Sequence, residues 1–315
     1  MTKLEEYLQG VKTAAIAGHV NPDGDCIGSC MGMYLYLRDN YPEIRTQVYL
    51  EDWRDVFSFI EGIGEAKDTC DPEPVDLLIL LDISSPTRIG VASPLLETAG
   101  KTLCIDHHVT NRGTYTWFHN EPRISSASEV LLGFLESEKI SNACAAALYT
   151  GIVNDTGVFR YSSTTPETMR AAACLMEKGI PFSEIIDTTF FQKSYDQNRM
   201  LGKVLLESRR LFDGKVIIGT ALHSDMETFR LESKDMDGIV SELRNTAGAE
   251  VAVFLYETRE GYFKVSLRSR EHVDVSRIAQ TFGGGGHIRA AGCNLEGTPE
   301  EVAGRITAEL EQYLG

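Results

Sequence analysis

The stretch that most constrains the fold is residues 13–29, TAAIAGHVNPDGDCIGS. Its first five residues form a short apolar run with β character, and a helical pattern begins near Cys26. Between them lie His19, Asp23 and Asp25, with a proline and a glycine that favour a loop. The stretch therefore predicts a strand, a loop and a helix, with one imidazole and two carboxylates after the strand. In open α/β sheets, ligands bind at the C-terminal edge of the strands.

Two carboxylates this close in sequence repel each other unless something positive lies between them. Asp23 and Asp25 could share a proton, accept N–H groups from the start of the following helix, or bind a metal ion. A mixture of imidazole and carboxylate suits Mn²⁺, Fe²⁺ or Zn²⁺ better than Ca²⁺. The plain alternative is a polar turn in which an aspartate caps the helix.

Three further segments are followed by acids or histidines. The segment 76–82 ends in Asp82, and the segment 102–105 is followed by Asp106, His107 and His108. The helical segment 142–153 is followed by Asp155. The first of them, DLLILLD, is a continuous apolar run typical of a buried parallel strand. Because the ends of parallel strands meet at one edge of a sheet, we expect the acids and histidines of all four segments to converge. This convergence favours a binding site over a polar turn.

Strands and helices alternate in the N-terminal part, which predicts an α/β fold with a mainly parallel sheet and helices on both of its faces. We expect strands at 13–17, 46–50, 76–82 and 102–105, and helices at 2–10, 26–38, 125–138, 142–153 and 166–179.

The length of 315 residues suggests two domains, and the pattern changes after residue 187. We expect a catalytic domain at 1–187, a helical linker at 188–211 and a smaller α/β domain at 212–315. In the last of these, we expect strands at 215–222, 250–256 and 262–267, and helices at 236–246, 274–281 and 298–313.

The composition narrows the classes of function. A net charge of −16 argues against a large non-specific nucleic-acid surface, although metals, arginines or N–H groups could invert the charge at a phosphate site. No apolar run reaches the roughly 18 residues that span a membrane, so we expect no membrane partner. The N-terminus lacks the apolar core of a secretory signal. Seven dispersed cysteines without a Cys-x-x-Cys pair predict reduced thiols and a cytoplasmic protein.

The motifs occur in a fixed order: His19-x-Asn-x-Asp23-x-Asp25-x-x-Gly28, Asp82, Asp106-His107-His108, Asp155-Thr156-Gly157, and a Gly-Gly-Gly-Gly-His run at 283–287. Together they resemble the DHH phosphoesterase family with its C-terminal DHHA1 domain, over nearly the whole chain. At this length the chain is most similar to the nanoRNases, which degrade short oligoribonucleotides and remove the 3′-phosphate of 3′-phosphoadenosine 5′-phosphate. Class II inorganic pyrophosphatases share the N-terminal motifs but have a different C-terminal domain, and RecJ-type exonucleases are longer.

The resemblance implies two divalent metal ions, usually Mn²⁺. One would be held by His19, Asp23 and Asp82, and the other by Asp25, Asp82, His107 and Asp155, with Asp82 as the bridge. The charges of the four aspartates would balance those of the two ions. A water that bridges ions roughly 3.5–4 Å apart loses a proton near neutral pH and can attack phosphorus as hydroxide.

Beside the metals, the resemblance suggests that His108 contacts the scissile phosphate and acts as an acid on the leaving oxygen, although a core histidine is the alternative. We expect Asp106 to orient His107, or else to cap a loop. Arg88 could reach a phosphate or could be a surface residue.

The glycine run could present N–H groups to a phosphate, and it is not a P-loop because no Lys-Ser or Lys-Thr follows it. The residues expected to hold the non-scissile phosphate are Arg268, Gly284, Gly285, Gly286 and His287. The alternative is a glycine-rich turn packed against a sheet.

The leading hypothesis is a two-metal phosphohydrolase that acts on short single-stranded RNA or dinucleotides and on 3′-phosphoadenosine 5′-phosphate. One alternative is a phosphodiesterase of linear or cyclic dinucleotides such as di-adenylate. Another is a nucleotide-binding regulator without catalysis, which the full set of competent metal ligands disfavours. A homodimer is left open.

Overall fold

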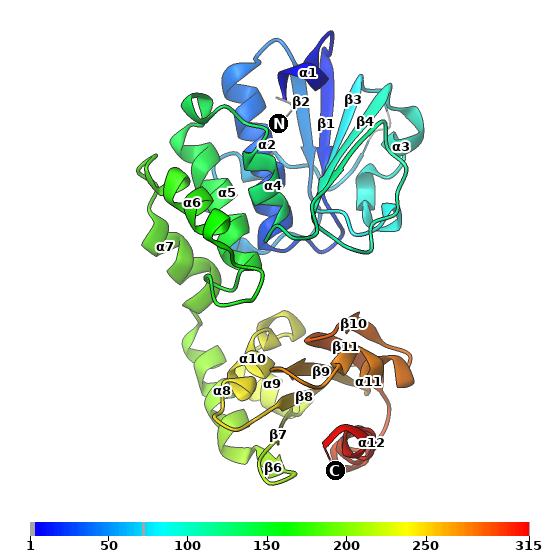
Figure 1. Cartoon of the computed structure of the whole chain (residues 1–315). Coiled ribbons are helices and arrows are strands. Elements are labelled where there is room, and N and C mark those ends of the chain that lie inside the picture. Colours follow the sequence, from blue (N-terminus) through cyan, green and yellow to red (C-terminus); the bar gives the residue numbers. More distant parts are fainter. Residues whose placement is uncertain (1–3, 71–72, 315) are drawn as a thin grey trace. The chain divides into compact units, whose positions relative to one another are not determined.

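The structure is a computed structural model that describes residues 4–70 and 73–314 (Figure 1). It contains two compact units, Met1–Gln192 and Lys193–Gly315, called here the N-terminal and C-terminal units. Among the described residues, none of the helices combines the length and the apolar character that a membrane crossing requires.

The N-terminal unit contains five parallel strands in the order β2-β1-β3-β4-β5. The strands are β1 (Thr13–Ala17), β2 (Arg45–Tyr49), β3 (Leu77–Leu81), β4 (Lys101–Asp106) and β5 (Trp117–Asn120). Since β2 lies on one side of β1 and β3 on the other, the direction in which the sheet grows reverses at β1. Open parallel sheets bind ligands outside the strand ends at such a reversal.

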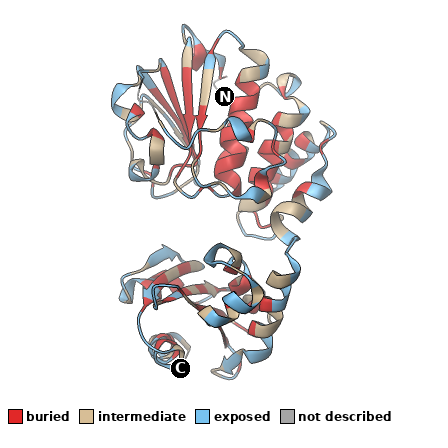
Figure 2. Cartoon of the chain, turned by 180° about the vertical axis from the view of Figure 1, so that it is seen from behind, coloured by how far each residue is buried: buried red, intermediate tan, exposed pale blue. Residues whose placement is uncertain are grey.

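Helices cover both faces of this sheet, as the sequence predicts. Its helices are α1 (Glu5–Leu8), α2 (Gly24–Asn40), α3 (Leu95–Thr98), α4 (Ala127–Leu132), α5 (Asn142–Asp155), α6 (Pro166–Met176) and α7 (Phe182–Ile186). Alternate side chains of β1 and β3 point to opposite faces, because strand side chains alternate. One face packs against α2 and α4, and α5 packs on α2. The other is covered by α3 and two single-turn 3₁₀ helices, Pro86–Arg88 and Gly90–Ala92. Buried residues gather along the strands and the adjoining helices (Figure 2).

The helices α2 and α5 approach each other unusually closely. A Cβ atom added at Gly28 would lie 2.6 Å from the carbonyl oxygen of Ala147 and 2.6 Å from the backbone nitrogen of Gly151. Only glycine fits such a backbone contact. The contact lies one turn from Asp25 in α2 and one turn from Asp155 in α5, so it brings these two acids together.

Several N-terminal elements differ from the predictions. The helix expected at 125–138 is α4 followed by a separate 3₁₀ turn, Ser137–Lys139, because α4 ends at Leu132, just before Gly133, a poor helix former. The strand β5 was not predicted, since four residues at a sheet edge carry a weak pattern. The helix expected at 2–10 is only Glu5–Leu8, and residues 2–3 lie outside the described residues.

The C-terminal unit contains a six-stranded mixed sheet in the order β10-β11-β9-β8-β7-β6. The strands are β6 (Arg209–Leu211), β7 (Val216–Ala221), β8 (Val251–Glu257), β9 (Phe263–Ser269), β10 (Gly285–His287) and β11 (Ala290–Leu295). Only the β7–β8 pair is parallel among these neighbours. One face packs against α8 (Tyr195–Glu207), α9 (His223–Phe229) and α10 (Ile239–Arg244). The other packs against α11 (Val275–Thr281) and α12 (Pro299–Leu314).

Residues 188–211, the predicted linker, contain most of a π-helical turn (Asp187–Phe191), then α8 and β6. The helix α8 packs on β7 and α9 of the C-terminal unit. The helix expected at 236–246 is wrong in part, because it is a 3₁₀ turn, Ser233–Met236, and α10, separated at Gly238, whose φ is 89°. The last residues of the glycine run form β10.

Candidate metal centre

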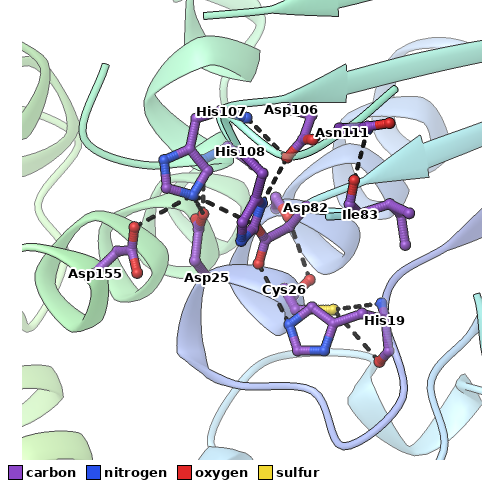
Figure 3. A network of polar contacts seen from close by, with 12 residues as sticks. His19, Asp25, Cys26, Asp82, Ile83, Asp106, His107, His108, Asn111 and Asp155 are labelled. Atoms are coloured by element: carbon purple, nitrogen blue, oxygen red, sulfur yellow. Dashed lines mark hydrogen bonds and ion pairs between the residues drawn. The ribbon is translucent and has the colours of Figure 1, made fainter. Parts of the chain in front are cut away.

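The predicted metal ligands lie at the ends of neighbouring elements of the N-terminal unit (Figure 3). They follow β1, β3 and β4 or lie at the facing ends of α2 and α5: His19, Asp23, Asp25, Asp82, His107 and Asp155. The structure brings all six together. Their role as metal ligands stays a prediction.

Three carboxylates converge on the ring of His107. Its Nε2 lies 3.5 Å from Asp82 Oδ1, 3.4 Å from Asp155 Oδ2 and 3.9 Å from Asp25 Oδ2. The two aspartates that come from helices reach this point because α2 and α5 pack closely. One nitrogen facing three acid oxygens is a donor set that a cation can occupy.

His19 forms the second half of the centre. Its Nε2 lies 3.5 Å from Asp82 Oδ2 and 3.7 Å from Asp23 Oδ1. Its Nδ1 lies 2.9 Å from the carbonyl oxygen of Val20, an acceptor for Nδ1–H, and its Nε2 faces the acids. The two oxygens of Asp82 thus face two different imidazoles, as a bridging carboxylate requires.

Within the part of the chain that the structure describes, three groups of donor atoms lie close enough together to hold a metal ion: Asp25 with His107 and Asp155, Asp82 with His107 and His108, and His19 with Cys26 and Asp82. Cys26 was missed by the sequence analysis, and Asp23 falls outside these groups. Burial raises the pKa of the Cys26 thiol well above its usual value, which disfavours the thiolate that a metal needs. Its Sγ accepts the N–H of His19 over 3.2 Å, so Cys26 holds the backbone of that histidine.

The acids of the centre strongly affect one another. Burial, and then the charge of Asp82, raise the pKa of Asp25 to about 7. Burial and the charge of Asp25 likewise raise the pKa of Asp155 well above its usual value. Although burial opposes the charged form of His107, the carboxylates of Asp82 and Asp25 raise its pKa to about 10. Although burial also opposes ionisation of Asp82, contacts with His107 and His19 lower its pKa. The pocket therefore attracts positive charge.

Asp82 provides a direct test of whether a metal fits. Its Oδ1 is buried and receives no hydrogen bond among the described residues. Its backbone has a φ of 58°, in the left-handed region that few residues other than glycine adopt. Buried polar atoms are normally paired, so this oxygen calls for a partner. A divalent cation fits, because the surrounding donors are carboxylate oxygens and imidazole nitrogens.

Asp25 is fixed by contacts far along the chain. Its Oδ2 accepts the N–H of Ala127 over 2.6 Å, and its Oδ1 accepts the N–H of Ser128 over 3.0 Å. Both donors belong to the first turn of α4. The N-terminus of that helix also favours a negative charge, which locates the carboxylate without a basic side chain.

Asp106 orients a different ring from the one expected. Its Oδ1 lies 2.9 Å from Nδ1 of His108, whereas it contacts His107 through the backbone N–H, over 2.8 Å. The prediction that Asp106 orients the His107 ring is therefore corrected to His108. Asp106 itself is fully buried, and its Oδ2 accepts a hydrogen bond from Asn111 over 2.8 Å.

Arg88 lies beside the centre on an exposed 3₁₀ turn. Its Nη2 lies 3.2 Å from Nδ1 of His19 and 3.3 Å from the carbonyl oxygen of Val20. The guanidinium of Arg88 thus lies beside His19, one of the predicted metal ligands. Its role toward a phosphate stays a prediction.

The predicted phosphate-binding residues of the C-terminal unit lie in or beside two strands, β10 and β9, which flank β11. Gly285, Gly286 and His287 form β10 at the edge of the sheet, and a Cβ at Gly284 would come within 2.1 Å of the carbonyl oxygen of Gly292. The end of the run therefore forms an edge strand packed against β11, and its role toward a phosphate stays a prediction.

Strand register brings His287 and Arg268 to one face. His287 pairs with Ala290 in β11, and Ala290 pairs with Arg268 in β9. Residues paired across strands point to the same face, so the side chains of Arg268 and His287 lie two strands apart, or about 10 Å. Arg268 is half-buried and His287 is exposed.

Comparison with known proteins agrees with these observations. The profile of the DHH family, N-terminal domain, matches residues 13–152, and that of the DHHA1 domain matches residues 213–315. Over 306 residues the chain is 33% identical to the bifunctional oligoribonuclease and PAP phosphatase NrnA of Thermus thermophilus, covering 94% of this chain and 89% of the relative. It is 27% identical over 322 residues to the Bacillus subtilis protein of the same name, covering 98% and 97%.

Among solved structures, an exopolyphosphatase-related protein of Bacteroides fragilis superposes with a TM-score of 0.91. The two are 27% identical, and the match covers 98% of this chain and 94% of the other.

Proposed function

This chain belongs to the DHH family of phosphoesterases, and from that premise we propose that it is a two-metal hydrolase with two kinds of substrate. It would cleave short single-stranded oligoribonucleotides and remove the 3′-phosphate of 3′-phosphoadenosine 5′-phosphate. Relatives at 33% and 27% identity over nearly the whole chain carry both activities in their names. The observation that carries the proposal is Asp82, whose two oxygens each lie 3.5 Å from a different imidazole nitrogen.

Two divalent ions, Mn²⁺ in this proposal, would supply Lewis acidity and an activated water. His19, Asp23 and Asp82 would hold one ion, and Asp25, Asp82, His107 and Asp155 the other. The Oδ1 of Asp82, which receives no hydrogen bond among the described residues, and the acids that surround His107 support this assignment.

His108 would protonate the leaving oxygen. Asp106 lies 2.9 Å from its Nδ1, so Nδ1–H donates to that carboxylate and the other ring nitrogen is left for the substrate. Arg88, beside His19, would contact the scissile phosphate.

The C-terminal unit would recognise the phosphate that is not cleaved. Arg268 and His287 lie on one face of the sheet, and a guanidinium and an imidazole N–H can both donate hydrogen bonds to a phosphate. The backbone of Gly284, Gly285 and Gly286 would line the same phosphate.

We also propose that the protein works in the cytoplasm, because all seven of its cysteines are free. A homodimer stays a prediction. Size-exclusion chromatography with light scattering, which measures the mass of the protein in solution, tests it.

The proposed activity is tested with purified protein stripped of metal and then supplied with Mn²⁺, Mg²⁺ or Zn²⁺. The substrates are linear di-adenylate, cyclic di-adenylate and 3′-phosphoadenosine 5′-phosphate. We expect release of AMP from the linear dinucleotide, and of AMP and phosphate from 3′-phosphoadenosine 5′-phosphate, fastest with Mn²⁺ and absent with a chelator.

Three outcomes would contradict the proposal. Turnover of neither substrate by protein with bound Mn²⁺ would reject both activities. Faster cleavage of the cyclic than of the linear dinucleotide would favour a cyclic-dinucleotide phosphodiesterase. Tight nucleotide binding without turnover would favour a regulator.

A further inference from the structure

Asn111 is a fully buried residue that joins the ends of β3 and β4 (Figure 3). Its Nδ2 donates to Asp106 Oδ2 over 2.8 Å and to the carbonyl oxygen of Ile83 over 2.6 Å. Its Oδ1 accepts the N–H of Gly113 over 2.9 Å and the hydroxyl of Tyr115 over 3.4 Å. The nitrogen thus faces two oxygen acceptors and the oxygen faces two donors, so the orientation of the amide is determined.

Only a carboxamide satisfies these neighbours. Asparagine offers two N–H donors and an oxygen with two lone pairs, and all four are used here. Leucine has a similar size but would leave Asp106 Oδ2 and the Ile83 carbonyl without this partner in a dry interior. Aspartate keeps the acceptor but has no donor when ionised, and it would place a second carboxylate against Asp106.

Through Asp106, Asn111 acts on His108. The amide holds one oxygen of the Asp106 carboxylate, while the other lies 2.9 Å from Nδ1 of His108. A carboxylate fixed at both oxygens has a fixed plane, and that plane sets the direction of the imidazole. The backbone N–H of Asn111 also donates to the carbonyl oxygen of His108, over 3.2 Å.

Through Ile83, Asn111 acts on Asp82. Ile83 directly follows Asp82, whose φ of 58° is unfavourable for a residue with a side chain. Such a conformation persists only where the surroundings hold it in place. The backbone N–H of Asp82 donates to the carbonyl oxygen of Ile105 over 3.3 Å. The side-chain amide of Asn111 donates to the carbonyl oxygen of Ile83, the next residue in the chain.

We propose that Asn111 is a positioning residue that sets two parts of the centre at once: the bridging carboxylate of Asp82 and the acid His108. The inference rests on the proposed function for the role of His108, whereas its effect on Asp82 concerns metal binding alone. Asn111 does not touch the substrate or a metal in this proposal. Because one amide holds both, the position of the Asp82 carboxylate and that of the His108 ring depend on each other.

The test compares Asn111→Leu and Asn111→Asp with Tyr115→Phe, which removes the hydroxyl contacts to Asn111 Oδ1 and to Cys104 but keeps the amide and both of its acceptors. For each full-length protein, kcat and KM are measured on linear di-adenylate and on the p-nitrophenyl ester of thymidine 5′-phosphate. Mn²⁺ affinity is measured by calorimetry and Tm by scanning calorimetry.

Substitutions of groups that orient ligands typically reduce metal affinity or activity by about 10- to 100-fold. We expect a loss of that size in kcat on di-adenylate for both Asn111 variants, with KM near the wild-type value. The loss should be several-fold smaller on the nitrophenyl ester, because nitrophenolate leaves without a proton. Mn²⁺ should bind about 10-fold more weakly. Tyr115→Phe should match the wild type in every measurement.

Wild-type kcat and Mn²⁺ affinity in Asn111→Leu would overturn the inference, as would equal losses on the two substrates with unchanged Mn²⁺ affinity. If Asn111→Leu fails to fold, Asn111→Asp is judged by the same criteria. If the wild type cleaves no nucleotide, the proposed function fails, and the Mn²⁺ affinities still decide whether Asn111 positions Asp82.

Discussion

Asp82 is almost fully buried, and its backbone has a left-handed conformation. One oxygen of its carboxylate receives no hydrogen bond among the described residues. Backbone strain and an unpaired buried polar atom each cost of the order of 1–3 kcal/mol. Such costs accumulate at functional sites, where the surrounding structure supports them. At the scale of single residues, Asp82 is therefore the position that most directly tests the centre.

We predict that Asp82→Asn lowers kcat on di-adenylate by at least about 1,000-fold, or about 4 kcal/mol of activation free energy. The amide loses the charge and one of the two oxygens that would bridge the ions. Mn²⁺ should also no longer raise the Tm. The control is Asp213→Asn, at an exposed aspartate of the C-terminal unit with a similar φ of 54°. A Tm increase with Mn²⁺ as large as that of the wild type would count against Asp82 as a ligand.

A second residue-scale prediction concerns Glu250. Burial opposes its charge, but N–H groups of Val273, His272 and Glu271 donate to it and lower its pKa below the usual 4.5. The ionised form is thus favoured in the folded state, and its contribution to stability is complete above pH 4.5. That contribution is lost as the pH falls through the lower pKa of the folded state.

We therefore expect Glu250→Gln to lower the Tm at pH 7, with a difference from the wild type that shrinks as the pH falls below the usual glutamate pKa. Thermal unfolding measured from neutral to acidic pH checks this. A difference that stays constant over the whole series would show that the charge of Glu250 is not involved.

At the scale of elements, the contact between α2 and α5 determines whether the acids on the two helices meet. The contact is backbone to backbone at Gly28, and Asp25 and Asp155 lie about one turn from it on their own helices. Helix packing distances normally reflect side-chain size, so glycine is what allows this close approach. The proposed metal centre therefore depends on a residue that has no side chain.

We predict that Gly28→Ala destabilises the N-terminal unit by about 1–3 kcal/mol, the usual cost of overpacking, and weakens Mn²⁺ binding at least 10-fold. The added methyl group would push the helices apart at the end that carries the acids. Gly32→Ala is the matched control, one turn away, where the methyl group meets the movable side chain of Leu148 instead of backbone. Equal effects of the two substitutions on Mn²⁺ affinity would contradict this explanation.

At the scale of the whole molecule, the two units carry different chemistry. The acids and histidines of the proposed metal centre belong to the N-terminal unit, whereas Arg268, His287 and the glycine run belong to the C-terminal unit. If one unit cleaves and the other selects, substitutions in the two should change different kinetic constants.

We predict that His287→Ala raises KM for 3′-phosphoadenosine 5′-phosphate about 10-fold, or about 1.4 kcal/mol, with little change in kcat. The control is His272→Ala, at an exposed histidine of the same unit whose ring lies 3.7 Å from Glu271. Steady-state kinetics on 3′-phosphoadenosine 5′-phosphate gives kcat and KM for both variants and checks this prediction. A loss confined to kcat in His287→Ala would assign that residue to the cleavage step instead.

Much of the fold and most of the candidate site could be predicted because the signals are local. An apolar run that ends in Asp82 or in Asp106-His107 marks a buried strand and supplies the polar group at its end. A parallel sheet then brings such ends to one edge, whatever the side chains between them. The prediction was weakest for short edge strands such as β5 and β10, where few residues carry the pattern.

The sequence by itself therefore determined which residue types stand at the strand ends. Those acids and histidines in turn indicate the kind of site, a candidate metal site. Only the tertiary structure decided how those residues are held: Asp25 by α4, 102 residues along the chain, Asp106 and Ile83 by Asn111, and α2 against α5 at Gly28. These contacts depend on how helices and strands pack and align. Residues far apart in the chain create that arrangement jointly, so no local pattern contains it.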